Sequence, residues 1–180
     1  MNEEAYLLIV DDNLENLNVI GNILKDKHYK IALARNGVSA LQILDEIEID
    51  LILLDIMMPD MDGYEVCTRI KKNAALEDIP VIFISALNET KDIVKGFNCG
   101  GIDYITKPFK AEEIIARVDT HLKLRKQTLE LKMINANKDL FISILAHDLK
   151  NPFNHLINFS DILLKNFRLT EIHEIEKSWA

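Results

Sequence analysis

Three carboxylates, a hydroxyl and a lysine stand at the ends of short apolar runs in this sequence. Asp11 and Asp12 follow the first run, Asp55 follows the third, Ser85 ends the fourth and Lys107 follows the fifth. If these runs are parallel strands of one open sheet, their carboxyl ends share one edge, where ligands bind. The sequence therefore predicts one polar site assembled from separate segments.

The charges of this predicted site need compensation. Carboxylates 4 Å apart repel by roughly 4 kcal/mol per pair at an effective dielectric near 20. The Lys107 ammonium and a hard divalent cation, Mg²⁺ by ligand preference, would offset that repulsion. A metal that keeps waters leaves room for phosphoryl oxygens, and a carboxylate can act as a nucleophile. The alternative, in which Asp11 and Asp12 only cap the helix starting at Asn13, leaves the other side chains unexplained.

The elements that must position these side chains follow from hydrophobic periodicity. Strands are predicted for residues 6–10, 30–34, 50–54, 81–85 and 103–106, and helices near 13–26, 37–47, 64–74, 89–97 and 110–122. Near-continuous apolar runs at 51–54 and 81–84 suit strands buried on both faces of a parallel sheet. The alternation predicts an α/β fold with a five-stranded doubly wound parallel sheet.

Residues 5–122 resemble a known family, the receiver domain of bacterial response regulators, which has a flavodoxin-like fold. The resemblance is carried by four stretches, Ile9–Asn13, Leu53–Gly63, Val81–Ala86 and Asp103–Phe109. It implies that Asp55 is the phosphoacceptor and that Lys107 pairs with the phosphoryl group. It also implies a switch hydroxyl at Ser85 and a switch aromatic at Tyr104. The implied magnesium ligands are Asp11, Asp12, Asp55 and the carbonyl of Met57.

The segment after residue 122 has a helical pattern to residue 167, with Pro152 as its only breaker. Apolar residues at heptad and four-residue spacing predict a coiled-coil or bundle seam and a homodimer through the C-terminal helices; they are Leu122, Leu129, Met133, Ala136 and Leu140. The alternative is an amphipathic helix that folds back on its own sheet.

His147 lies on the polar face of this helical segment, opposite an apolar stripe from Leu145 to Leu163. Asp148 could orient its imidazole or accept its proton, and Pro152 removes an N–H that would bond the Asp148 carbonyl. Residues 141–153 resemble the H-box of sensor histidine kinases, whose phosphotransfer domain is a dimeric helical bundle. The resemblance implies that His147 is a phosphoacceptor, Asp148 its acid/base neighbour and Asn151 a polar assistant.

These two resemblances predict the N-terminal part of a hybrid histidine kinase in a phosphorelay. Its predicted parts are a receiver at 1–122, a helical linker at 123–139 and a truncated phosphotransfer domain at 140–180. No glycine follows Gly101, so ATP is expected to bind only in a missing domain, and this chain should not be active alone. The expected partners are a phosphohistidine donor or acceptor protein and a second copy of the chain.

Two rival functions use the same residues. The first is a non-enzymatic receiver switch on a dimeric coiled coil. The second is a magnesium phosphohydrolase with Asp55 or Asp11 as nucleophile, which is disfavoured because residues 11–14 read Asp-Asp-Asn-Leu and lack a DxDxT pattern.

Composition argues against several other classes of protein. Of 29 acidic residues 22 precede residue 123, against 12 of 21 basic ones, which argues against nucleic-acid binding there. The N-terminus has an apolar run of only six residues, so neither a signal peptide nor a membrane span is predicted, and a cytoplasmic location is expected. Cys67 and Cys99 lack CxxC spacing and are interpreted as core or surface residues rather than a disulfide framework or zinc site.

Overall fold

The predicted sheet is present in the computed structural model, which describes residues 5–25, 27, 29–86 and 89–177. Side chains at 151, 155, 156, 161 and 163–177 lie outside this description. The strands are β1 (Tyr6–Val10), β2 (Lys30–Ala34), β3 (Leu51–Asp55), β4 (Val81–Ser85) and β5 (Asp103–Thr106). They are all parallel, in the order β2-β1-β3-β4-β5. The doubly wound α/β prediction is confirmed, although β3 runs one residue further along the chain than expected.

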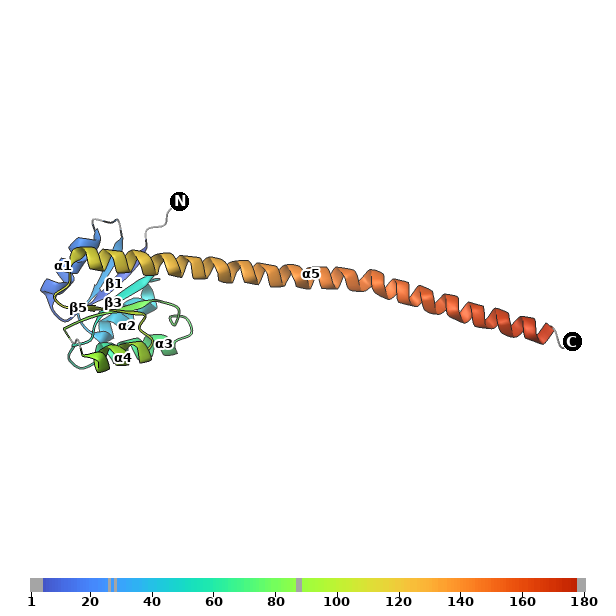
Figure 1. Cartoon of the computed structure of the whole chain (residues 1–180), viewed down its shortest axis with the longest axis horizontal. Coiled ribbons are helices and arrows are strands. Elements are labelled where there is room, and N and C mark those ends of the chain that lie inside the picture. Colours follow the sequence, from blue (N-terminus) through green and yellow to red (C-terminus); the bar gives the residue numbers. More distant parts are fainter. Residues whose placement is uncertain (1–4, 26, 28, 87–88, 178–180) are drawn as a thin grey trace. The chain divides into compact units, whose positions relative to one another are not determined.

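Helices cover both faces of the sheet (Figure 1). They are α1 (Leu14–Lys25), α2 (Gly37–Glu46), α3 (Gly63–Lys72), α4 (Thr90–Asn98) and α5 (Ala111–Lys177). The helix α1 and the first turns of α5 lie on one face, and α2, α3 and α4 lie on the other. Two helix starts are fixed by side chains, because Asn36 accepts the Ser39 N–H and Asp62 accepts the Glu65 N–H.

The core forms two apolar layers because alternate strand residues point to opposite faces of the sheet. Leu8, Val10 and Phe83 pack toward α2 and α3, and Ile9 and Ile84 pack toward α1 and the start of α5. All residues of β3 and β4 are buried, as the continuous apolar runs predicted. This rigid frame fixes where the strand ends lie.

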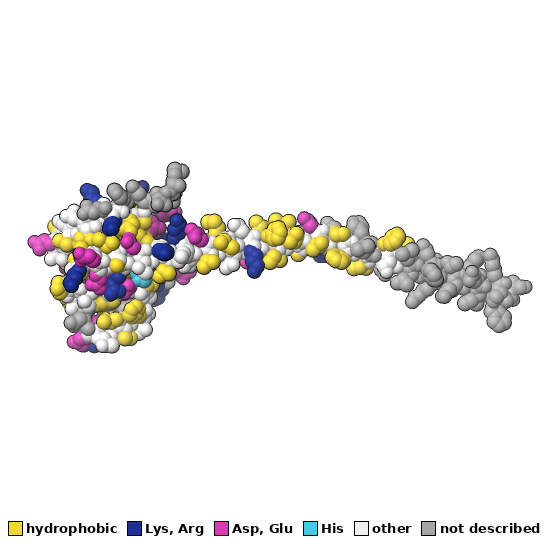
Figure 2. All heavy atoms as spheres, turned by 45° about the horizontal axis from the view of Figure 1, so that its top comes forward, with side chains coloured by type: hydrophobic (Ala, Val, Ile, Leu, Met, Phe, Trp, Pro, Cys, Tyr) yellow, Lys and Arg dark blue, Asp and Glu magenta, His cyan; other side chains and the backbone are white. Residues whose placement is uncertain are grey.

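The chain divides into two compact units, residues 1–128 and 129–180. In the second unit, large apolar side chains of α5 are exposed, and Figure 2 shows them along the described part of this helix. None of the helices within the described residues combines the length and apolar character that crossing a bilayer requires.

Two sequence expectations for α5 are corrected. Pro152 does not break the helix, which continues through it; one missing backbone hydrogen bond is a small loss among those of a 67-residue helix. Leu122, the first residue of the predicted seam, packs against the sheet's own apolar core beside Ile114 and Val118. Its heptad spacing to Leu129 is therefore not evidence for a seam at that point.

Candidate functional site

Three carboxylates meet at the carboxyl ends of β1 and β3, as the sequence predicted. Asp11, Asp12 and Asp55 each offer an oxygen, and these oxygens all lie within 4.8 Å of one another. Asp11 and Asp55 are buried, whereas Asp12 is exposed. The cluster thus opens to solvent on the Asp12 side, where a small ligand could enter.

Local hydrogen bonds orient the two buried carboxylates. Asp11 accepts the Asn13 N–H at 2.9 Å, and both of its oxygens accept from the Asn16 side-chain amide at 3.0 Å. Asp55 accepts the Ile56 N–H at 2.9 Å. Asn16 was not predicted as a site residue, because its position in the first turn of α1 is a weak signal among four asparagines in residues 13–22.

Lys107 supplies the positive charge at this site. Its Nζ lies 2.8 Å from an Asp11 oxygen and 3.2 Å from an Asp55 oxygen. Burial disfavours the ammonium, but its hydrogen bond to Asp11 and the charges of Asp55 and Asp11 together raise the pKa of Lys107. The peptide bond between Lys107 and Pro108 is cis.

One lysine does not fully compensate the carboxylates. Burial raises the pKa of Asp55 most, and repulsion by Asp11 raises it further. The Lys107 ammonium lowers this pKa, as does a weaker hydrogen bond from the Met57 backbone. A pocket of convergent carboxylate oxygens with residual negative character matches the ligands that Mg²⁺ prefers. Asp11, Asp12 and Asp55 therefore fit a magnesium ion. The carbonyl of Met57 stays a predicted further ligand.

The two expected switch residues lie beside each other next to the acidic cluster. Ser85 ends β4 and is fully buried, and Tyr104 in β5 is 8% exposed. Burial raises the pKa of Tyr104, and a hydrogen bond with the Ser85 side chain counteracts this. The Tyr104 ring centroid lies 6.4 Å from that of Phe83. Tyr104 thus already occupies an inward position in this structure.

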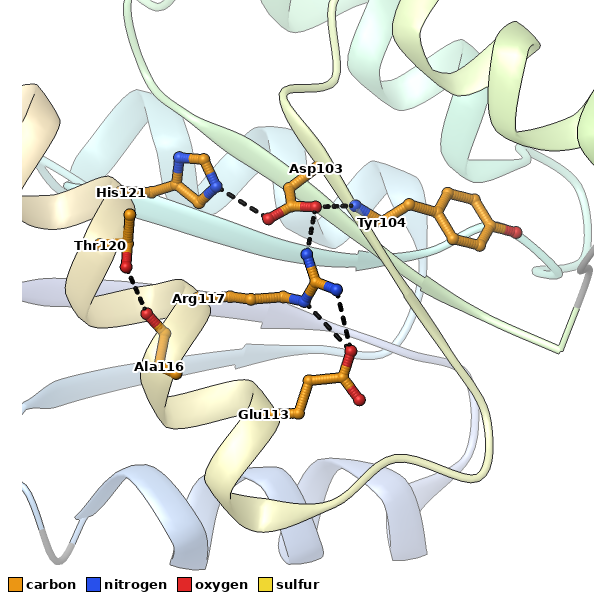
Figure 3. A network of polar contacts seen from close by, with 7 residues as sticks. All are labelled: Asp103, Tyr104, Glu113, Ala116, Arg117, Thr120 and His121. Carbon is orange, nitrogen blue, oxygen red and sulfur yellow. Dashed lines mark hydrogen bonds and ion pairs between the residues drawn. The ribbon is translucent and has the colours of Figure 1, made fainter.

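A polar network between β5 and α5 was not predicted (Figure 3). Asp103 pairs with Arg117 at 2.6 Å and with His121 at 2.9 Å, and Arg117 also bonds Glu113. Burial opposes ionisation of Asp103, but hydrogen bonds from His121, Arg117 and the Tyr104 N–H outweigh it and lower its pKa. The spacing of Arg117 and His121 one turn apart places both on one face of α5, but no sequence signal names Asp103 as their partner.

The residues of the H-box resemblance lie in the second unit. His147 Nδ1 is 3.4 Å from an Asp148 oxygen, and both side chains are largely exposed. The Asn151 side chain lies outside the described residues. Leu145 and Leu149 of the predicted apolar stripe are exposed as well, so the polar face of His147 and its role as a phosphoacceptor stay predictions.

Comparison with known proteins identifies the first unit. The response regulator receiver domain model matches residues 7–119. A "Probable cyclic di-GMP phosphodiesterase" of Vibrio cholerae is 41% identical over 142 residues, covering 79% of this chain and 32% of that protein. The regulatory protein NisR of Lactococcus lactis is 41% identical over 117 residues, covering 65% of this chain and 50% of that protein.

A solved structure agrees with these matches. The signal receiver domain of a histidine kinase from Syntrophus aciditrophicus superposes with a TM-score of 0.63 at 35% identity, covering 66% of this chain and 90% of that chain. The chain belongs to the response regulator receiver domain family. It spans between about a third and a half of the length of the two curated relatives.

The expectation that this chain is part of a protein-histidine kinase is wrong. Its curated relatives include response regulators and transcriptional regulators rather than kinases. The match to the Syntrophus protein is to a receiver domain, and the family match ends at residue 119. The similarity of residues 141–153 to an H-box therefore gains no support, because a short helical stretch with one histidine is weak evidence without the rest of its domain.

Proposed function

We propose that the first unit is a phosphorylation-controlled switch whose phosphoacceptor is Asp55. Receivers of response regulators act in two-component systems with histidine kinase or phosphotransfer partners. The observation that carries the assignment is the position of Asp55, which is buried and in contact with Lys107 at 3.2 Å beside Asp11 and Asp12. Asp11 shares this burial, this cation and this cluster, but both of its oxygens already accept hydrogen bonds from the Asn16 amide, so Asp55 is the better acceptor.

In the proposed transfer, an Asp55 oxygen forms a bond to phosphorus as the phosphohistidine P–N bond breaks. The departing imidazole keeps the electron pair of that bond and takes a proton from water. Lys107 stabilises the charge that develops on the phosphoryl oxygens, and the bonds from Asn13 and Asn16 hold Asp11 in place. Mg²⁺ held by Asp11, Asp12 and Asp55 would supply further positive charge for the phosphoryl oxygens.

Intact mass spectrometry after incubation with acetyl phosphate and Mg²⁺ tests this assignment. A single phosphoryl adduct is expected on the wild-type chain and on the Asp45→Asn control, which removes an exposed carboxylate on α2. Asp55→Asn should carry none, and chelation of the metal should abolish the wild-type adduct. A persistent adduct in Asp55→Asn would place the acceptor elsewhere.

We further infer that the second unit self-associates as a homodimer. Met133, Ile134, Leu140, Phe141 and Ile144 share one face of α5, and each exposes more than half of its surface. An isolated helix gains little stability in water without a packed apolar face, so this face favours a second copy of the helix. The proposal divides the chain into a receiver at 1–122, a helical linker at 123–139 and a C-terminal helical segment at 140–180. His147 in the last segment is a predicted second phosphoacceptor.

Light scattering across a concentration series tests the association. The wild-type chain should approach twice the monomer mass. The double variant Met133→Glu and Leu140→Glu should shift it toward the monomer, whereas Asn135→Glu, on the opposite side of the helix, should not. A wild-type chain that stays monomeric at the highest concentration would contradict the inference and leave the Asp55 assignment intact.

A further inference from the structure

Two cysteines that are 32 positions apart in the sequence lie together in the fold. Cys67 is in the middle of α3 and is fully buried, and Cys99 directly follows α4 and is half-buried. The Cys67 Sγ donates a hydrogen bond to the Cys99 carbonyl at 3.3 Å, and the Cys99 Sγ donates to the Gly96 carbonyl at 3.1 Å. Neither cysteine takes part in the acidic site.

We propose that Cys67 and Cys99 form a reversible intramolecular disulfide when the protein meets a hydroperoxide. A disulfide needs two sulfur atoms that can approach to about 2 Å on neighbouring backbones. The contact of the Cys67 sulfur with the Cys99 backbone shows that the two chain segments already adjoin. Gly100, with a φ of 97°, follows Cys99 directly, and a small backbone adjustment there would align the sulfurs.

The environments of the two sulfurs assign different roles to them. Cys99 is the more exposed of the two, and the neighbouring Cys67 thiol outweighs the effect of burial and lowers the pKa of Cys99 to about 7, so a substantial fraction of this thiol is ionised near neutral pH. The neighbouring Cys99 thiol, together with burial, raises the pKa of Cys67. Cys99 is therefore the attacking group, and Cys67 is the resolving group held next to it.

The reaction proceeds in two balanced steps. The Cys99 thiolate attacks one peroxide oxygen and the O–O bond breaks, giving a sulfenic acid and a hydroxide or alkoxide that takes a proton from water. The Cys67 sulfur then attacks the Cys99 sulfur and the S–O bond breaks, with the Cys67 proton leaving in water. The two sulfurs lose two electrons in total, and the hydroperoxide gains them.

The linkage would tie the end of α4 to α3. Gly96 of α4 is tightly packed, since a Cβ there would lie 3.1 Å from the Phe83 ring and 3.8 Å from the Tyr104 ring. A covalent tie at Cys99 would therefore restrain the wall of the pocket that holds Tyr104. Slower hydrogen exchange of α4 amides in the oxidised protein is the expected consequence.

The test is oxidation of the folded, reduced full chain with hydrogen peroxide, followed by proteolysis and mass spectrometry. The expected product is a peptide pair joined through Cys67 and Cys99 within one chain, lighter by two hydrogens and separated again by dithiothreitol. Dimedone, which captures sulfenic acids, should label Cys99 and lower the yield of the linked pair. Cys67→Ala should leave Cys99 as the labelled species, and Cys99→Ser should leave the buried Cys67 unreacted.

Several outcomes would overturn the proposal. They are retention of both free thiols at peroxide doses that oxidise an exposed thiol in a short peptide, linkage only between separate chains, and oxidation of Cys99 with Cys67 still free. Tyrosine fluorescence checks whether Cys67→Ala folds. If this variant does not fold, dimedone capture on the wild-type chain is sufficient to decide the order of the two steps. Linkage that occurs only after urea denaturation would also contradict it.

Discussion

Replacing Asp55 with asparagine should stabilise the metal-free protein, although Asp55 forms an ion pair. The oxygens of Asp11 and Asp12 lie within 4.8 Å of an Asp55 oxygen. At an effective dielectric near 20 each carboxylate therefore repels Asp55 by at least about 3.5 kcal/mol, whereas Lys107 at 3.2 Å attracts it by about 5 kcal/mol. Repulsion exceeds attraction by roughly 2 kcal/mol, and burial of the Asp55 charge adds to the imbalance.

The direction of the pKa shift gives the same sign. Because burial and Asp11 raise the pKa of Asp55 against the effect of Lys107, the folded state binds its proton more tightly than the unfolded state. The stability of the wild-type protein then falls as the pH rises from the ordinary carboxyl value of 3.8 through the raised value. Asp55→Asn lacks this loss, so its advantage should be absent at pH 3 and present at neutral pH.

Urea unfolding in a chelator, followed by tyrosine fluorescence, measures the effect. All four tyrosines precede residue 105, so this signal reports on the first unit. We expect Asp55→Asn to raise the free energy of unfolding by about 1 to 3 kcal/mol. The lower value applies when solvent screens the repulsion from the exposed Asp12. The Asp45→Asn control should stay within about 0.5 kcal/mol of wild type. Added Mg²⁺ should stabilise the wild-type protein more than the variant and narrow the gap.

An equal or lower stability of Asp55→Asn in chelator would refute this reasoning. It would mean that the contact with Lys107 outweighs both the repulsion and the cost of burial. The proposed phosphoacceptor role would be unaffected, because that role depends on the mass experiment.

Three further predictions concern backbone packing and pH. Gly63→Ala should cost at least about 2 kcal/mol in the same urea assay, because its Cβ would lie 2.2 Å from the Asp55 carbonyl oxygen. Gly21→Ala in α1 should gain about 0.5 to 1 kcal/mol, since the nearest atom is 4.0 Å away; a loss would show that this helix does not tolerate a methyl group there. Asp103→Asn should cost about 1.5 to 3 kcal/mol at pH 7, because Arg117 and His121 lose a charged acceptor. As the pKa of Asp103 is lowered in the folded state, this cost should be present above pH 3.8 and disappear as the pH falls through the lowered value; a difference independent of pH would contradict the ion pair.

Local sequence patterns were sufficient to predict the strands and the residues of the acidic cluster. Strand signals are local, since short aliphatic runs such as Leu51–Leu54 suit a strand buried on both faces. The alternation of such runs with helices then favours parallel pairing. Because parallel strands end at one edge, the sequence places Asp11 and Asp55 at that edge, and the pairing of β1 with β3 in the structure makes them neighbours. Lys107 followed from the same rule at β5.

The contacts between distant side chains beyond the strand ends could not be predicted in this way, because they depend on tertiary packing. Asp103 with His121, and Cys67 with Cys99, join elements whose rotation about their own axes depends on how whole faces pack, and no local pattern encodes that rotation. For the same reason Leu122 belongs to the core rather than to a seam, although its spacing fits both. Periodicity specifies that a side chain must be covered, whereas the packed structure specifies what covers it.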